Sequence, residues 1–247
     1  MFYIKNGYVM GRIYENINRA NEVEVKTALR TLVTDGVSSP AYRGAFFSLG
    51  HSLGDVIRDR FDSLGKVLLV CASEDADWLA KGVLAAFPQK MALAVFWSKR
   101  LRICDNPKVE LSPIVKSYID PDAFSCDTMI IVKSIISTSC VVKTQINYLV
   151  DKTNPERIII AAPVMYKDAK SNLEAEFPEE ITSKFSYCAF AIDDERDEST
   201  GAVIPGVGGM VYDKLGLGGV IQKNSYMLQI VRERAFGKVS KPQMACV

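Results

Sequence analysis

Short apolar runs, each long enough for one strand, recur along this chain between longer stretches in which apolar residues have helical spacing. Five runs are typical of buried strands: Val67–Ala72, Met91–Trp97, Thr128–Val132, Arg157–Ala162 and Ser186–Ile192. Three stretches are typical of helices: Tyr42–Phe61, Trp78–Phe87 and Val141–Val150. This alternation predicts an α/β fold, a central and mostly parallel sheet flanked by helices. We see no internal repeat and no linker, so we expect one domain over residues 1–247.

The composition is that of an ordinary globular protein and argues against several kinds of partner. Of the 247 residues, 48% are hydrophobic and 24% are charged, which is enough apolar material for a core. The formal net charge is +1, so no long-range field favours nucleic acid or an anionic membrane. The apolar runs are too short to span a bilayer, and residues 1–5 lack the pattern of a signal peptide. We therefore expect a cytoplasmic protein without nucleic-acid or membrane partners.

The cysteines and the histidine limit the metal and redox chemistry that we expect. The six cysteines have no CxxC pairing, and several lie in expected strands, which favours buried reduced thiols over disulfides. They are Cys71, Cys104, Cys126, Cys140, Cys188 and Cys246. His51 is the single histidine, so the sequence has no His cluster for zinc. It lies off the apolar face of its helix, and we expect it to be an exposed surface residue.

A Pro-Gly loop of sequence Val-Ile-Pro-Gly-Val-Gly-Gly, residues 203–209, follows a strand that ends in Ala191-Ile192-Asp193-Asp194. The proline and glycines allow a tight, open backbone whose N–H and C=O groups could meet a flat heterocycle edge-on. This segment resembles the base-binding segment of uracil phosphoribosyltransferases. In that family a strand ending in Ala-Ile-Asp leads to a loop of the Val-Pro-Gly-Leu-Gly-Asp type.

Other segments match the same family in order, over roughly residues 20–218. They include Leu29–Leu32, Tyr42-Arg43, Phe46-Phe47, Ala161–Pro163 and Glu176–Pro178. The resemblance implies a type I phosphoribosyltransferase-like fold and a homodimer. It divides the domain into an N-terminal arm with helices (1–40), a flexible hairpin (98–126), a hood over the base pocket (193–218) and a C-terminal extension (219–247).

The family grips the pyrophosphate of the sugar donor PRPP with a loop of sequence Leu-Arg-Ala-Gly-Leu-Gly after the first strand. In this chain Glu74 stands at the place of the arginine, and Asp75 and Asp77 lie beside it. Three carboxylates in a partly buried site would repel a pyrophosphate of about three negative charges by several kcal/mol. A bridging Mg²⁺ ion would offset this repulsion, because carboxylates are ligands of hard cations. Alternatively, the acids belong to a solvated helix N-terminus with Ser73 as its N-cap.

The PRPP loop of the family, an acid followed by Pro-Met-Leu-Ala-Thr-Gly-Gly-Ser, corresponds here to a segment that starts at Val132. Val132 replaces the acid that the resemblance assigns to the ribose hydroxyls, and Thr138 and Ser139 replace the glycines. Lys133, Ser137, Thr138 and Ser139 are candidate ligand-binding residues, since hydroxyls and N–H groups at a helix N-terminus can hold an anion. The alternative is an ordinary helix cap without a ligand.

The Pro-Gly loop and the expected hairpin supply the remaining candidates. The resemblance implies that main-chain groups of Val203 and Gly208 read the base, whereas the alternative is a structural Pro-Gly turn. Asp213 resembles the acid of a later Asp-Arg pair in the family. The other ligand-binding candidates are Pro205, Gly206, Gly209 and Met210 in the loop, and Arg100 in the hairpin that would approach the pyrophosphate.

Three functions are compatible with these residues, and all imply a small-molecule ligand. The first, which we favour, is an enzyme of specialised metabolism that acts on a small heterocyclic or otherwise non-pyrophosphate ligand. The second is a PRPP-dependent nucleobase phosphoribosyltransferase, with Mg²⁺ as its one candidate cofactor. The third is a non-catalytic sensor that signals through a partner. For the enzyme, the acid–base candidates are Glu74, Asp75, Asp77 and Asp213.

Overall fold

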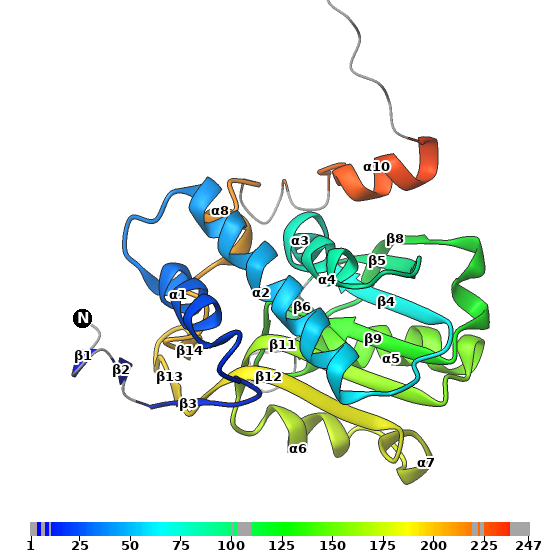
Figure 1. Cartoon of the computed structure of the whole chain (residues 1–247), viewed down its shortest axis with the longest axis horizontal. Coiled ribbons are helices and arrows are strands. Elements are labelled where there is room, and N and C mark those ends of the chain that lie inside the picture. Colours follow the sequence, from blue (N-terminus) through cyan, green and yellow to red (C-terminus); the bar gives the residue numbers. More distant parts are fainter. Residues whose placement is uncertain are drawn as a thin grey trace, which may run out of the picture.

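The computed structural model describes residues 4–5, 8–9, 11–99, 101–102, 110–218, 222 and 225–237. The strands of its central sheet lie in the order β3 (Arg12–Tyr14), β12 (Phe185–Asp193), β11 (Arg157–Tyr166), β9 (Thr128–Val132), β4 (Val67–Ala72), β5 (Ala92–Ser98) and β8 (Ile114–Ile119). The five inner strands are parallel, and the two edge strands run antiparallel to their neighbours. The short β10 (Ile135–Ile136) also pairs with β11. The predicted mostly parallel α/β sheet is confirmed (Figure 1).

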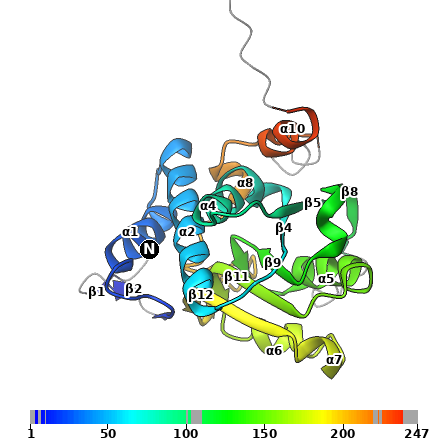
Figure 2. The ribbon, with the colours of Figure 1, turned by 45° about the vertical axis from the view of Figure 1, so that its right-hand side comes forward.

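Alternate residues of the inner strands face two separate cores, because successive side chains of a strand point to opposite faces. In β4, Leu69 and Cys71 belong to one core, and Leu68 and Val70 belong to the other. The first core lies under α1 (Glu22–Val33), α2 (Ser39–Arg60) and α4 (Lys81–Ala86), and the second under α5 (Cys140–Thr153) and α6 (Ala169–Glu174). Figure 2 shows these helices on the two sides of the sheet, as the prediction requires.

The helix that follows β4 packs very closely against α2. It consists of α3 (Ser73–Asp75), the π-helical turn η1 (Ala76–Ala80) and α4, in continuous sequence. A Cβ atom on Gly50 would lie 2.1 Å from the carbonyl oxygen of Leu79, and one on Gly82 would lie 2.2 Å from that of Phe47. Only glycine fits at these two positions, so the contact holds α3, with its acidic residues, at the end of β4.

The segment expected as a hairpin contains both a hairpin and a sheet edge. The strands β6 (Leu101–Arg102) and β7 (Glu110–Leu111) pair with each other, and β8 then pairs with β5. A 3-10 helix, η2 (Pro121–Ser125), leads from β8 into β9. Sequence analysis missed both edge strands, β3 and β8, because such strands are partly exposed and lack the continuous apolar run of a buried strand.

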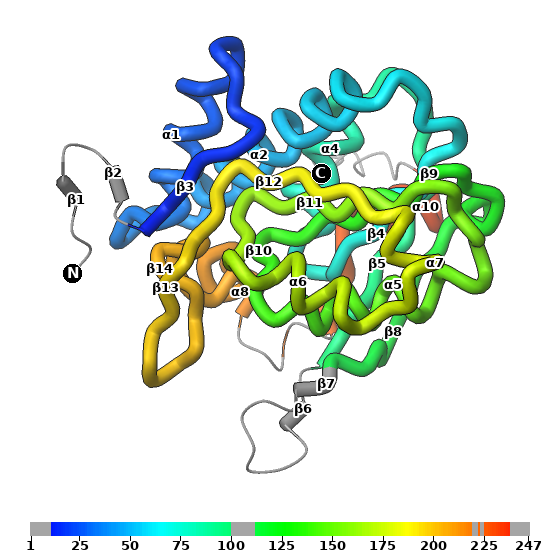
Figure 3. The backbone as a smooth tube through the Cα atoms, turned by 90° about the horizontal axis from the view of Figure 1, so that it is seen from below, coloured from blue at the N-terminus to red at the C-terminus, as the bar shows by residue number. Residues whose placement is uncertain are grey.

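The chain after β12 forms small elements beside the sheet and over its helices. The strands β13 (Glu195–Arg196) and β14 (Val203–Ile204) pair with each other and precede α8 (Val211–Lys214). Figure 3 shows them at the same end of the sheet as β10. The last helix, α10 (Gln229–Phe236), lies over α3 and α4 in Figure 1. The remaining elements are α7 (Glu179–Thr182) before β12 and the pair β1 (Ile4–Lys5) and β2 (Tyr8–Val9) near the N-terminus.

The expected reduced thiols are confirmed for Cys71, Cys126 and Cys188, which are buried and free. Burial raises the pKa of Cys188 to about 12. Cys104 and Cys246 lie outside the described residues. His51 is partly exposed and contacts Asp55 one turn further along α2. Within the described ranges, the structure contains no helix with the length and apolar character needed to cross a membrane.

Candidate functional site

A cavity of about 460 Å³ lies at the carboxyl ends of the parallel strands, where β4 and β9 are neighbours. The helix after β4 packs on one face of the sheet, and α5 after β9 packs on the other, which makes this a switch point of the type where α/β proteins bind ligands. The residues that line the cavity are Glu74, Ser98, Lys99, Ser112, Lys133, Ser134, Ile135, Ile136, Ser137, Thr138, Ser139, Cys140, Val141, Val142, Gly209, Met210, Val211 and Tyr212.

Two acids after β4 and one lysine after β9 form what we call the acidic cluster: Glu74, Asp75 and Lys133. Lys133 Nζ lies 3.1 Å from Glu74 Oε1 and 2.7 Å from Asp75 Oδ2. The other oxygen of Asp75 accepts a hydrogen bond from the backbone N–H of Ser134 at 3.0 Å. Glu74 is 7% exposed and Asp75 is 1% exposed. Two carboxylates against one ammonium group give the cluster a net charge of −1 when all three are ionised.

The cluster sets the protonation of its members. Burial raises the pKa of Asp75, and the nearby Lys133 ammonium opposes this rise. Burial alone would lower the pKa of Lys133, but the carboxylates of Asp75 and Glu74 outweigh it and raise this pKa above its usual range. Lys133 therefore stays charged at neutral pH and cannot accept a proton. Glu74 is the carboxylate of the cluster that lines the cavity.

Asp77, the third acid of the segment, points away from the cavity and binds the C-terminal helix. Its two side-chain oxygens accept hydrogen bonds from the backbone N–H groups of Ile230 at 2.8 Å and Gln229 at 2.9 Å. These are N–H groups of the first turn of α10, which have no partner within the helix. Asp77 therefore caps α10, and the structure does not bring it together with Glu74 and Asp75.

The segment between β9 and α5 supplies hydroxyl groups to the cavity. Thr138 is exposed, and Ser137 Oγ accepts a hydrogen bond from Arg196 at 2.7 Å. Ser139 has a φ of 61° and precedes the first residue of α5, and its hydroxyl donates to the carbonyl oxygen of Ala169 at 2.8 Å. Lys133, Ser137, Thr138 and Ser139 thus all line the cavity, and the hydroxyls of Ser137 and Ser139 have protein partners. Their role in ligand binding stays a prediction.

The Pro-Gly loop packs into the body of the protein. The N–H of Gly206 donates to Asp193 at 2.8 Å, and its C=O accepts from Arg12 at 2.7 Å. The carbonyl oxygen of Val207 accepts a hydrogen bond from the buried hydroxyl of Tyr42 at 2.7 Å. Three main-chain groups that could have met a heterocycle therefore have partners inside the protein.

Only the end of this loop reaches the cavity. Gly209 and Met210 line it, whereas Val203, Pro205 and Gly206 do not. Gly208 does not line it either, and a Cβ atom there would lie 2.0 Å from the carbonyl oxygen of Leu32. Asp213 is exposed on α8 and lies outside the lining as well. Arg100 lies outside the described residues.

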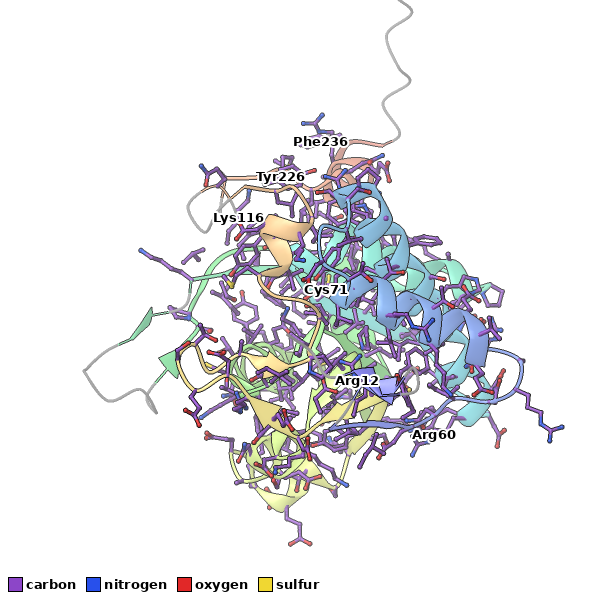
Figure 4. All side chains as sticks on the ribbon, turned by 90° about the vertical axis from the view of Figure 1, so that its left-hand side faces the viewer. Arg12, Arg60, Cys71, Lys116, Tyr226 and Phe236 are labelled. Atoms are coloured by element: carbon purple, nitrogen blue, oxygen red, sulfur yellow. The ribbon has the colours of Figure 1, made fainter. Side chains whose placement is uncertain are left out.

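An ion pair that sequence analysis missed holds the Pro-Gly loop in place. Arg12, which is labelled in Figure 4, binds Asp193 through two hydrogen bonds of 2.7 Å, and the two side chains are 1% and 0% exposed. An acid that closes an apolar strand, as Asp193 does, needs a partner if it is buried, since a buried charge is costly unless it is paired. The sequence does not say which cation this is, because Arg12 belongs to an edge strand.

The acids do not form a magnesium site. Both oxygens of Asp75 are occupied by Lys133 and the Ser134 N–H, and both oxygens of Asp77 by α10. Among the described residues, no three His, Cys, Asp or Glu side chains are grouped so that they could hold a metal ion. The residues described therefore do not form a site for the bridging Mg²⁺ ion that the three carboxylates suggested in the sequence.

Comparison with known proteins identifies a shared fold. No protein-family model matches the sequence. No curated protein sequence matches it either. Among solved structures, the AQ2163 protein from Aquifex aeolicus is similar over 82% of this chain and 97% of its own, with a TM-score of 0.62 and 14% identity.

Two further structures have lower scores. A hypoxanthine phosphoribosyltransferase from Staphylococcus aureus has a TM-score of 0.36 at 10% identity, over 50% of this chain and 65% of its own. A hypothetical protein from Neisseria gonorrhoeae with bound ppGpp has a TM-score of 0.41 at 11% identity, over 61% of this chain and 80% of its own. It is the similarity to the Aquifex protein, with its TM-score of 0.62, that shows a shared α/β fold.

Proposed function

We propose that the cavity binds a small heterocyclic molecule that is uncharged or cationic, and that the protein is a divergent phosphoribosyltransferase-like enzyme of specialised metabolism that does not use PRPP. The observation that carries this proposal is the acidic cluster, in which the two carboxylates of Glu74 and Asp75 share the one ammonium group of Lys133. A pyrophosphate of about three negative charges would meet a net negative charge there, and the repulsion would amount to several kcal/mol at short range.

Glu74 is the residue to which we assign acid–base chemistry. It lines the cavity, and the neighbouring Lys133 keeps its proton, so a carboxylate rather than an amine is offered to the ligand. A carboxylate within hydrogen-bond reach of a ring N–H can accept that hydrogen bond or take the proton. Asp75 acts as a positioning residue, since its oxygens hold Lys133 and the backbone of Ser134.

The second candidate function is PRPP-dependent nucleobase transfer. It is favoured by Lys99, which lines the cavity, and by the hydroxyl groups before α5, because the N-terminus of a helix attracts anions. In this function, Lys99 would have to compensate for the acidic cluster.

Thermal unfolding with and without PRPP separates the two functions. We expect no rise in Tm with millimolar PRPP and Mg²⁺, and no PRPP-dependent consumption of uracil. A clear rise in Tm would support phosphoribosyl transfer instead, because a ligand that binds only the native state must stabilise it.

The variants Glu74→Gln and Glu74→Arg test the role of the charge directly. Glu74→Arg changes the net charge of the cluster from −1 to +1 and should produce PRPP binding that the wild type lacks. Glu74→Gln, the matched control, removes the negative charge without adding a positive one and should have a smaller effect. Equal PRPP affinity in all three proteins would show that the cluster does not govern ligand charge.

We also propose, from the family resemblance, that the protein is a homodimer. Sedimentation equilibrium should then give twice the chain mass of 27.3 kDa. A mass of one chain at micromolar concentration would contradict this.

A further inference from the structure

Two buried serine hydroxyls in the cavity wall have no hydrogen-bond partner. Ser98 is 5% exposed and Ser112 is 2% exposed, and neither Oγ atom has a partner. Within the described part of the chain, the other buried side-chain polar atoms without a partner belong to Trp97, Gln145 and Tyr187, none of which lines the cavity. The two serines are therefore distinguished by being both unpartnered and at the cavity.

The backbone brings these serines to one place. Ser98 is the last residue of β5, and the register of the β5–β8 pair shifts between Trp97 and Ser98. Ser98 is paired with Ile114, the first residue of β8. Ser112 precedes β8 and lies two residues before Ile114 in the sequence. The backbone N–H of Lys99 donates to the carbonyl oxygen of Pro113 at 3.1 Å and so ties the two segments together. Bulges of this kind commonly re-aim a side chain next to a site.

An unpartnered buried hydroxyl destabilises a folded protein, because it loses its hydrogen bonds to water and gains none in return. The neighbouring serines of the same cavity show that partners are available in this fold. Ser139 donates to a backbone carbonyl oxygen, and Ser134 Oγ lies 3.1 Å from Lys133 Nζ. Both residues line the cavity, so a change of χ1 rotamer at either serine would bring its hydroxyl to a ligand group there, which would supply the missing partner.

We propose that Ser98 and Ser112 form a specificity subsite that binds an uncharged oxygen-bearing group of the ligand, a carbonyl or a hydroxyl. A serine hydroxyl donates one hydrogen bond and accepts others, so it suits a neutral oxygen. This subsite rests on the proposed function. The subsite extends the proposed function in two ways. The heterocycle carries an oxygen substituent, and these two serines, rather than the Pro-Gly loop, recognise that oxygen.

The stability of the free protein gives the first test. Ser98→Ala and Ser112→Ala remove hydroxyls that have no partner, so each should leave Tm unchanged or raise it by about 2 °C. Ser139→Ala is the matched control, because it removes a buried hydroxyl that donates to Ala169. It should lower Tm by a similar amount. If Ser98→Ala and Ser112→Ala lower Tm as much as the control, both hydroxyls have partners in the free protein and the proposal is wrong.

The second test uses uracil and pyrimidine as probes. Uracil has two carbonyl oxygens and two ring N–H groups that pyrimidine lacks, so the part of its advantage that depends on the serines is found by comparing the wild type with the serine variant. Binding to the full chain is followed by ligand-observed NMR titration. In the wild type uracil should bind more tightly, and in the double variant S98A/S112A its advantage over pyrimidine should shrink about tenfold, the effect of one good hydrogen bond.

The outcomes of the probe test separate the subsite from the function. If uracil binds and its advantage is unchanged in the double variant, the subsite is refuted while the proposed function stands. If neither probe binds the wild type at millimolar concentration, the proposed function fails for this ligand class, and the subsite fails with it.

Discussion

Lys133 is paired with two buried carboxylates, and its removal should therefore have large effects. Substitution with methionine keeps the length of the side chain but removes the ammonium group that both Glu74 and Asp75 contact. Removing one partner of a buried ion pair costs about 3–5 kcal/mol, so we expect Lys133→Met to lower the free energy of unfolding by this amount at pH 8. Lys143→Met is the control, since Lys143 pairs with Glu176 at the surface, where such a pair contributes about 0–1 kcal/mol.

The pH dependence of the same variant has a definite sign. In the wild type, the raised pKa of Lys133 stabilises the folded protein. This stabilisation is fully present below the usual lysine pKa and is lost only as the pH rises through the raised value. Without the Lys133 ammonium group, which lowers the pKa of Asp75, burial and the charge of Glu74 raise this pKa further. Stability of Lys133→Met should therefore increase as the pH falls from 8 to 5. The free energy of unfolding is measured with urea at each pH. If Lys133→Met loses the same stability at every pH, the described contact between Lys133 and the two carboxylates is wrong.

At the residue level, the sequence located several residues that line the cavity, but it did not show which contacts each of them makes. The acids after β4 and the polar segment after β9 could be located because both follow apolar strands, and parallel strands end at the same edge. That Asp75 binds Lys133 while Asp77 caps α10 could not be predicted, because the direction of each side chain depends on the π-helical turn that begins at Ala76. Ser98 and Ser112 carried no sequence signal.

The contact between α2 and the helix after β4 depends on glycine. We expect Gly82→Ala to destabilise the protein by about 1–3 kcal/mol, the usual cost of overpacking, because the new Cβ atom would meet the carbonyl oxygen of Phe47. Gly44→Ala, also in a helix but with nothing within 4 Å of its Cβ position, should stabilise by about 0.5–1 kcal/mol. Chemical unfolding of both variants measures the difference, and equal effects would contradict the packing described here.

The C-terminal helix α10 is attached to the helix that carries the acidic cluster. Its residues Ile230 and Val231, with Leu228 before it, are buried, and Arg234 contacts Asp120. The apolar side of α10 thus faces the protein rather than a partner. Tyr226 and Phe236 are labelled at this end of the molecule in Figure 4, and Phe236 is 74% exposed.

Loss of the cap should loosen α10. We expect Asp77→Ala to cost about 1 kcal/mol, the typical value for an N-cap, and to speed amide exchange of residues 229–236. Asp213→Ala, at an exposed acid of α8, is the control and should leave this exchange unchanged. If α10 exchanges at the same rate in both variants and the wild type, the hydrogen bonds of Asp77 do not hold it.

At the level of elements, the buried strands were predictable and the edges were not. Val67–Ala72 and Thr128–Val132 have the predicted bounds, because a strand buried on both faces is continuously apolar. The strand Arg157–Tyr166 extends four residues beyond the predicted end at Ala162. The prediction stopped there because Pro163 follows, and proline usually ends a strand in a sequence-based prediction. β8 is exposed over several residues and gave no apolar signal.

The molecule as a whole is a sheet with a helical layer on each face and a cavity where its strand order changes direction. Alternation of strand-like and helix-like segments is enough to predict such a sheet. It cannot predict that a buried ion pair between β3 and β12 would turn the Pro-Gly loop away from the cavity, since that contact joins residues 181 positions apart. We therefore base the proposed ligand on the acidic cluster and the unpartnered serines rather than on the loop.

The most direct test of this account is equilibrium dialysis of the full chain against a mixture of cellular metabolites, with mass spectrometry of the molecules retained. The account predicts retention of an uncharged or cationic heterocycle that bears an oxygen substituent, and loss of this retention in Glu74→Arg. Retention of PRPP or another phosphorylated sugar by the wild type would contradict it.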